Sequence, residues 1–195
     1  MPFIAFLGCD GSGKSAVIAG VAEHLREMGE SVTLGHWRPK AFKAETNHSS
    51  AADDPHGQQP RGAVGSILKL AWLWLNWWIA WFRHLGRESR SGYVLFDRYH
   101  GDLLVDPRRY RYGGPMSLAR LASRLMPQPD FVIFLDAAPE VLLSRKQEVG
   151  VEALSAARAE YLEFCRGKRR NLIVDASRPL PSVIDEATHI VESIT

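Results

Sequence analysis

The sequence has few cysteines, little net charge and no segment typical of an export signal. Its two cysteines, Cys9 and Cys165, are too few for a disulfide framework and form no zinc-ligand spacing. We therefore expect free thiols in a reducing compartment. The formal net charge of +2 is too small to indicate a nucleic-acid partner. The apolar start at residues 2–7 lacks the basic flank of a signal peptide, so we expect a buried strand there and a cytoplasmic protein.

Segments with strand and helix character alternate along the 195 residues. The predicted strands are 2–7, 31–37, 93–97, 130–136 and 171–176, and the predicted helices are 14–28, 65–85, 139–148, 151–165 and 180–194. This alternation predicts a three-layer α/β fold, in which helices cover both faces of a parallel sheet of about five strands. We expect a single domain over residues 1–195. The small and polar residues at 41–62 predict a mobile loop.

A glycine-rich turn follows the first predicted strand. Residues 8–15, GCDGSGKS, match the P-loop pattern G-x-x-x-x-G-K-[ST] between a strand and a helix. Glycines let the backbone turn tightly and approach a phosphate, and the helix points its positive end at the same anion. Lys14 is expected to reach the β- and γ-phosphates, and the Ser15 hydroxyl to bind Mg²⁺. The motif thus predicts ATP and Mg²⁺ as cofactors, held by Asp10, Gly11, Ser12, Gly13, Lys14 and Ser15.

Three further segments occur in the order typical of one enzyme family. They are FDRYH at 96–100, FLDAAPEVLLSRK at 134–146 and VDAS at 174–177. Together with the P-loop, they resemble the thymidylate kinase family over most of the chain. The resemblance implies a P-loop kinase that transfers the γ-phosphoryl group of ATP to a nucleoside monophosphate, dTMP being the first expectation.

The resemblance also implies roles for individual residues. Asp97 is expected near Mg²⁺, through a water molecule, and Arg98 on the phosphate of the acceptor. Asp10 is expected to face the hydroxyl groups of the acceptor, and Arg38 to be a second clamp on its phosphate. The loop at Ala176 corresponds to one that touches adenine in the family.

A kinase of this type needs a cation on a lid that closes over the substrates. The P-loop has no arginine between Asp10 and Lys14, so we expect the lid, at about residues 145–158, to supply it. The candidates are Arg145, Lys146 and Arg158. Arg145 is the preferred catalytic residue.

The acceptor side departs from the family pattern. HWRPK at 36–40 stands where Arg-Glu-Pro-Gly is usual, and YHGDLLVDPRRYRYGGP at 99–115 replaces the usual segment near the base. That second segment is either a solvated loop or an acceptor site reshaped for another molecule. The alternatives are therefore a kinase for a sugar or lipid-linked glycan intermediate of surface polysaccharide synthesis, and a nucleotide-binding regulator without turnover.

The helix predicted at 65–85 is rich in tryptophan. Residues 66–82 hold Trp72, Trp74, Trp77, Trp78 and Trp81. This run is about 25 Å long as a helix, against about 30 Å for a bilayer core, and it is apolar nearly all round, which is typical of a buried helix. Three interpretations remain open: a core helix that also forms a homodimer interface, peripheral contact with a membrane or lipid-linked acceptor, and a transmembrane span.

Overall fold

The computed structural model describes residues 2–37, 61–146 and 150–194. Its sheet has five parallel strands in the order β2-β3-β1-β4-β5. The strands are β1 (Phe3–Leu7), β2 (Val32–His36), β3 (Tyr93–Asp97), β4 (Phe131–Asp136) and β5 (Asn171–Asp175). The predicted α/β fold with five parallel strands is confirmed.

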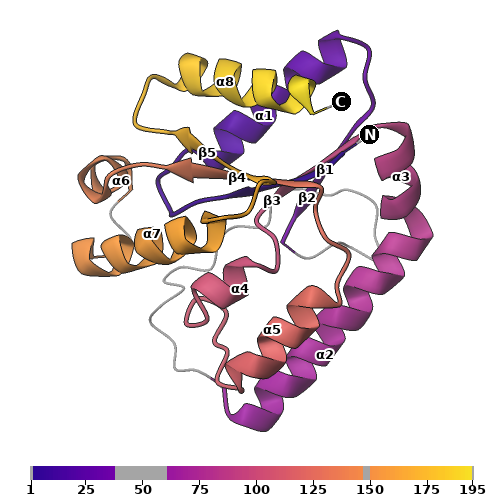
Figure 1. Ribbon diagram of the computed structural model, residues 1–195, viewed down its shortest axis with the longest axis vertical. Coiled ribbons are helices and arrows are strands. Elements are labelled where there is room, and N and C mark those ends of the chain that lie inside the picture. The colour runs from indigo at the N-terminus through magenta and orange to yellow at the C-terminus, as the bar shows by residue number, and fades with distance from the viewer. Residues whose placement is uncertain (1, 38–60, 147–149, 195) are drawn as a thin grey trace.

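Helices lie on both faces of this sheet (Figure 1). The helices α1 (Lys14–Glu27) and α8 (Leu180–Ser193) cover one face. The other face carries α2 (Ala63–Ala80), α4 (Asp102–Val105), α5 (Met116–Arg124) and α7 (Val151–Cys165), and α6 (Pro139–Arg145) lies beside β5. The two short helices α4 and α5 lie between residues 99 and 129, where no helix was predicted.

The central strands are buried because helices cover both of their faces. Every residue of β1 is buried, as are four of the five residues of β3. Such strands are continuously apolar instead of alternating, and this is why their sequences, FIAFL and YVLFD, were recognisable. On α1, the core-facing side chains include Val17, Val21 and Leu25 at helical spacing.

The tryptophan-rich helix is longer than predicted. α2 continues through the π-helical turn η1 (Trp81–Leu85) into α3 (Gly86–Ser91). Trp77 is fully buried against Phe3, Phe96 and Tyr99, with ring centroids 5.1 to 6.1 Å apart. This inner face fits the predicted core helix.

The outer face of α2 is not covered by other described residues, and the three interpretations of this helix stay open there. Residues such as Leu68, Trp72 and Phe82 are exposed, because among the described residues no further layer covers that side. By length and composition alone, the continuous helix Ala63–Ser91 could cross a membrane. In its most apolar stretch of 18 residues, 28% is buried inside the fold.

The strand order places several loops at one edge of the sheet. β1 lies between β3 and β4, so the connection after β1 runs to one side of this strand and the connection after β3 crosses to the other. Ligands bind at such a point in open α/β sheets. The P-loop follows β1, and Asp97 and Asp136 are the last residues of β3 and β4. Three parts of the sequence predictions fall outside the described residues: Arg38, positions 41–60 of the predicted loop, and positions 147–149 of the predicted lid.

Candidate active site

The P-loop forms a tight turn between β1 and α1. Gly13 has a φ of 80° at the N-terminal cap of α1, a left-handed conformation that favours glycine. Gly8 has a φ of 155°, and a Cβ there would lie 2.7 Å from Ser12 Oγ. Among the described residues no side chain caps the start of α1. Its first amide groups therefore remain for an anion, as in phosphate-binding helices.

Lys14 is folded into this loop. Its Nζ donates to the carbonyl oxygens of Gly8 and Cys9, both at 2.8 Å, and to Ser12 Oγ at 3.3 Å. Burial, and after it the nearby Arg98 guanidinium, lowers the pKa of Lys14 to about 8. An anion beside Nζ would favour the charged form, so the loop is suited to a phosphate group.

Ser15 and Asp97 form a small oxygen-rich site next to Lys14. Ser15 Oγ donates to Asp97 Oδ2 at 3.2 Å. The other oxygen, Oδ1, is buried and has no hydrogen-bond partner among the described residues. In the part of the chain that the structure describes, no three His, Cys, Asp or Glu side chains lie close enough together to hold a metal ion by themselves. One hydroxyl and one carboxylate fit Mg²⁺, which commonly takes its other oxygens from phosphates and water.

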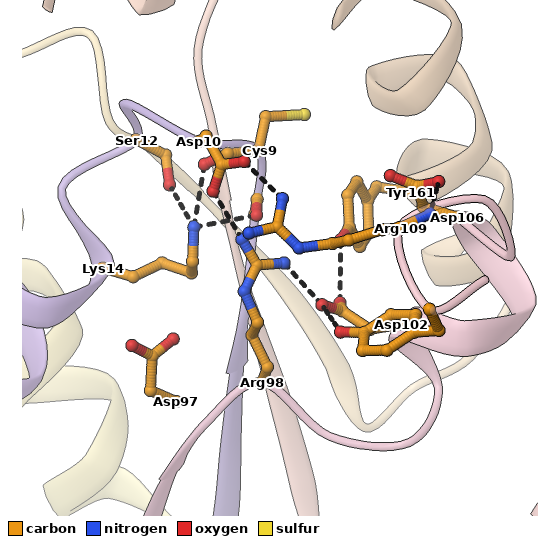
Figure 2. A network of polar contacts seen from close by, with 12 residues as sticks. Cys9, Asp10, Ser12, Lys14, Asp97, Arg98, Asp102, Asp106, Arg109 and Tyr161 are labelled. Atoms are coloured by element: carbon orange, nitrogen blue, oxygen red, sulfur yellow. Dashed lines mark hydrogen bonds and ion pairs between the residues drawn. The ribbon is translucent and has the colours of Figure 1, made fainter. Parts of the chain in front are cut away.

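Arg98 follows β3 in a strained backbone conformation. Its φ is 66°, which costs energy for a residue other than glycine and is often found at functional sites. The conformation directs the buried guanidinium toward the P-loop, where Nη2 donates to Asp10 Oδ1 at 2.7 Å (Figure 2). Arg98 Nη1 donates to Asp102 Oδ2 at 2.5 Å.

Asp102 holds Arg98 in place from the opposite side. Asp102 is fully buried on α4 and also accepts hydrogen bonds from Tyr110, at 2.9 Å, and Tyr161, at 2.7 Å. Burial raises the pKa of both tyrosines well above the usual value, and the Asp102 carboxylate raises them further. The hydroxyls are therefore donors that fix the ion pair.

A second arginine reaches the same acidic side chain. Arg109 Nη1 donates to Asp10 Oδ2, and its backbone amide donates to Asp106 Oδ1 at 3.1 Å. Burial alone would raise the pKa of Asp10, but Arg98 and Arg109 hold it well below the usual range. Asp10 is thus an anion between two cations (Figure 2). The sequence showed a basic cluster at 108–111 but not which arginine turns inward.

The predicted lid residues lie elsewhere on the sheet edge. Arg145 donates to the carbonyl oxygens of Ala176, at 2.8 Å, and Ser177, at 3.4 Å. Its guanidinium therefore contacts the predicted adenine loop and not the cluster around Asp10. Arg158 makes two hydrogen bonds to Asp136, at 2.7 and 2.8 Å, at the end of the strand beside the P-loop.

A buried aromatic pair lies against α2. The rings of Trp37 and Tyr110 stack with centroids 4.4 Å apart, and Lys69 donates to the Tyr110 carbonyl oxygen at 3.1 Å. Leu70 and Leu73 of α2 lie beside them. The 99–115 segment, predicted as either a solvated loop or a reshaped acceptor site, is therefore packed against α2.

Comparison with known proteins points to one family. No family model matches the sequence. The chain is 28% identical over 205 residues to a protein named "Probable thymidylate kinase" from Archaeoglobus fulgidus, covering 97% of this chain and 94% of that protein. It is 28% identical over 211 residues to the thymidylate kinase of Symbiobacterium thermophilum, covering 98% and 93%. A "Probable thymidylate kinase" from Sulfolobus acidocaldarius is 23% identical, with coverage of 99% and 97%.

These similarities run over nearly the whole length of each protein. They agree with the parallel sheet and with a cradle for phosphate at its central strand. Together they support a member of the thymidylate kinase family and indicate a P-loop kinase.

Proposed function

We propose that this kinase transfers the γ-phosphoryl group of ATP, bound with Mg²⁺, to a nucleoside monophosphate, with dTMP as the first candidate. The names of its relatives support a nucleotide acceptor. The observation that carries the proposal is the arginine pair beside the P-loop, buried Arg98 and partly buried Arg109. Two fixed guanidinium groups suit an acceptor that already carries a phosphate, because each offers paired donors to its oxygens.

The proposed reaction is an in-line displacement. Lys14 and the amides of residues 8–15 bind the β- and γ-phosphates, while Arg98 and Arg109 hold the acceptor phosphate with one oxygen aimed at the γ-phosphorus. Ser15 and, through water, Asp97 would hold Mg²⁺, which when bound would supply positive charge to the phosphates. Catalysis then depends mainly on positioning and on cations around the developing charge.

The lid cation is proposed to come from α6 or α7. Arg158 is held by Asp136 beside the P-loop, and Arg145 by the loop at Ala176. Either guanidinium can exchange its present acceptor for a phosphate oxygen when the lid closes. Ala176, which Arg145 contacts, is proposed to border the adenine ring.

The acceptor is proposed to bind in the pocket that Asp10, Arg98 and Arg109 line together with Leu154, Ala157 and Tyr161. Trp37 and Tyr110 are buried and stack on each other, so they support the wall of the acceptor side and leave no ring face open to a base. Tyr110 also donates to Asp102, which holds Arg98, so one network connects this wall to the phosphate site. Asp10 lies between these groups and the P-loop, where it is proposed to meet acceptor hydroxyls.

The test is an ADP-release assay with ATP and Mg²⁺ over a panel of acceptors. We expect turnover with dTMP that exceeds turnover with thymidine, which lacks the phosphate that the two arginines bind. Turnover with sugars or sugar phosphates and none with nucleotides would overturn the nucleotide proposal and favour the glycan intermediate. ATP binding without turnover on any acceptor would favour the regulator.

A further inference from the structure

The outer face of α2 carries an exposed apolar stripe. Its exposed members are Val64, Ile67, Leu68, Trp72, Leu75 and, in the following turn, Phe82. Their spacing of three or four residues puts them on one side of the helix, opposite the buried Leu70, Leu73 and Trp77. Exposed apolar side chains that form one continuous patch usually mark an interaction site.

The helix α5 widens this patch. α5 lies alongside α2 (Figure 1), and Trp78 Nε1 of α2 donates to the Leu125 carbonyl oxygen at 3.0 Å. Leu121 and Leu125 are both about half exposed, at 52% and 53%. The stripe on α2 and these two leucines are here called the α2–α5 surface.

The charges around the α2–α5 surface are almost all of one sign. Residues 61–91 and 116–125 contain one carboxylate, Glu88, and five exposed basic residues: Arg83, Arg87, Arg90, Arg120 and Arg124. Lys69 is not among them, because its ammonium contacts Tyr110 on the inner side of α2. The arginines of α3 and α5 are exposed. A second copy of this chain would bring the same excess of cations to the contact, whereas an anionic surface would complement it.

Apolar and basic features together match one class of partner. Interfacial helices insert Trp, Phe and Leu side chains at the headgroup boundary while Lys and Arg bind anionic lipids. Trp favours this boundary over the hydrocarbon centre. We propose that the α2–α5 surface docks peripherally on an anionic lipid bilayer.

The inner face of α2 determines that the helix lies on the bilayer and does not cross it. Trp77 packs against Phe3 of β1 and Phe96 of β3, so a spanning helix would have to leave the core. Docking through the outer face keeps these contacts and leaves the site at the P-loop outside the lipid. The proposal does not depend on which acceptor the kinase uses.

The test is co-sedimentation of the full chain with vesicles. One set contains phosphatidylcholine alone, and the other contains phosphatidylcholine mixed with phosphatidylglycerol. We expect wild type to bind the anionic vesicles at least about tenfold more tightly than the phosphatidylcholine vesicles. The fraction of protein bound to the anionic vesicles should fall as the salt concentration is raised. Wild type that stays in the supernatant with anionic vesicles would overturn the proposal.

Variants separate the apolar and the basic contributions. Leu68→Glu with Leu75→Glu should weaken anionic-vesicle binding at least about tenfold, and Arg120→Glu with Arg124→Glu should weaken it similarly. Matched controls are Met28→Glu, at a residue that is 58% exposed at the end of α1, and Arg166→Glu, at an exposed end of α7. Both controls should bind as wild type does, and circular dichroism checks that each variant is folded.

Two outcomes of these variants would also overturn the proposal. The first is wild-type vesicle binding by the Leu68→Glu, Leu75→Glu double variant. The second is light scattering that shows a wild-type dimer and a monomeric double variant, with no vesicle binding by either. That result would assign the α2–α5 surface to a second copy of the chain.

Discussion

Asp10 connects the phosphate-binding loop to the acceptor side of the site. Its carboxylate lies between Arg98 and Arg109, and Arg98 is fixed in turn by Asp102. Asp10 therefore keeps both cations in place before any ligand binds, which lowers the free-energy cost of ordering them later. Substitutions of the arginines in this cluster should weaken acceptor binding and leave ATP binding nearly unchanged.

Lys14→Ala should lower turnover at least about 100-fold. The substitution removes a cation that stabilises charge in the transition state, while the amides of the P-loop remain. Steady-state ADP release measures the effect, and circular dichroism checks the fold. Turnover close to wild type would contradict the proposed role of the P-loop.

Arg109→Ala should raise the acceptor KM by about tenfold or more and leave ADP binding nearly unchanged. The lost contact is a buried, charge-assisted one to the acceptor phosphate, with a typical value of about 1.5–3 kcal/mol. Arg108→Ala is the matched control, because Arg108 is an exposed neighbour. Steady-state kinetics at varied acceptor concentration measures the KM, and calorimetry measures ADP binding. Equal KM values for the two variants would argue against the arginine pair.

His100 should make stability depend on pH. It is 1% exposed, and neither ring nitrogen has a hydrogen-bond partner among the described residues. Burial lowers the pKa of His100 to about 3. Below the unfolded pKa of about 6.5 the unfolded chain binds a proton that the folded chain does not. The free energy of unfolding should therefore fall by about 2 kcal/mol between about pH 7 and pH 5.

His100→Phe should remove this component. Urea unfolding across the pH range measures it, and His189→Gln, at an exposed histidine of α8, serves as the control that keeps the wild-type dependence. An unchanged pH dependence in His100→Phe would show that other groups cause it.

At the scale of the element, α2 has two different faces. Trp77 is fully buried and Trp72 is 51% exposed, five residues apart on one helix. Trp77→Ala should cost about 3–5 kcal/mol of unfolding free energy, since it opens a cavity against β1 and β3. Trp72→Ala should change it by no more than about 0.5 kcal/mol. Similar losses in denaturant unfolding of the two variants would contradict the orientation of α2.

At the scale of the molecule, nucleotide binding should stabilise the whole fold. The P-loop joins β1, the central strand, to α1, which packs against α8. ADP with Mg²⁺ at about 100 times its Kd should add about 2.7 kcal/mol. For a chain of this size that corresponds to a rise in Tm of roughly 5–10 °C. Dialysis should reverse the shift, Lys14→Ala should reduce it, and its absence in wild type would contradict nucleotide binding at this loop.

The homodimer and the cytoplasmic location expected from the sequence stay predictions. The same holds for a single domain over the whole chain and for Arg38 as a clamp, which lies outside the described residues. Light scattering without lipid tests the dimer, and its result also bears on the α2–α5 surface.

The sequence alone determined the parallel α/β fold and the positions of the phosphate-binding loop and the strand-end aspartates. These features depend on local patterns: continuous apolar runs for strands buried on both faces, and glycines where the backbone must turn. That is why all five strands and the P-loop were predictable from residues close together in the chain. The position of Asp97 near the P-loop was expected from the family resemblance, because Asp97 and Ser15 are 82 residues apart.

Only the tertiary structure decided which arginine faces the site and which side of α2 is covered. Arg108, Arg109 and Arg111 are equivalent in the sequence, and packing of the 99–115 segment against α2 and α7 selects Arg109. An apolar helix likewise does not specify which of its faces meets the sheet. Such choices depend on contacts between residues far apart in the chain, which no local pattern encodes.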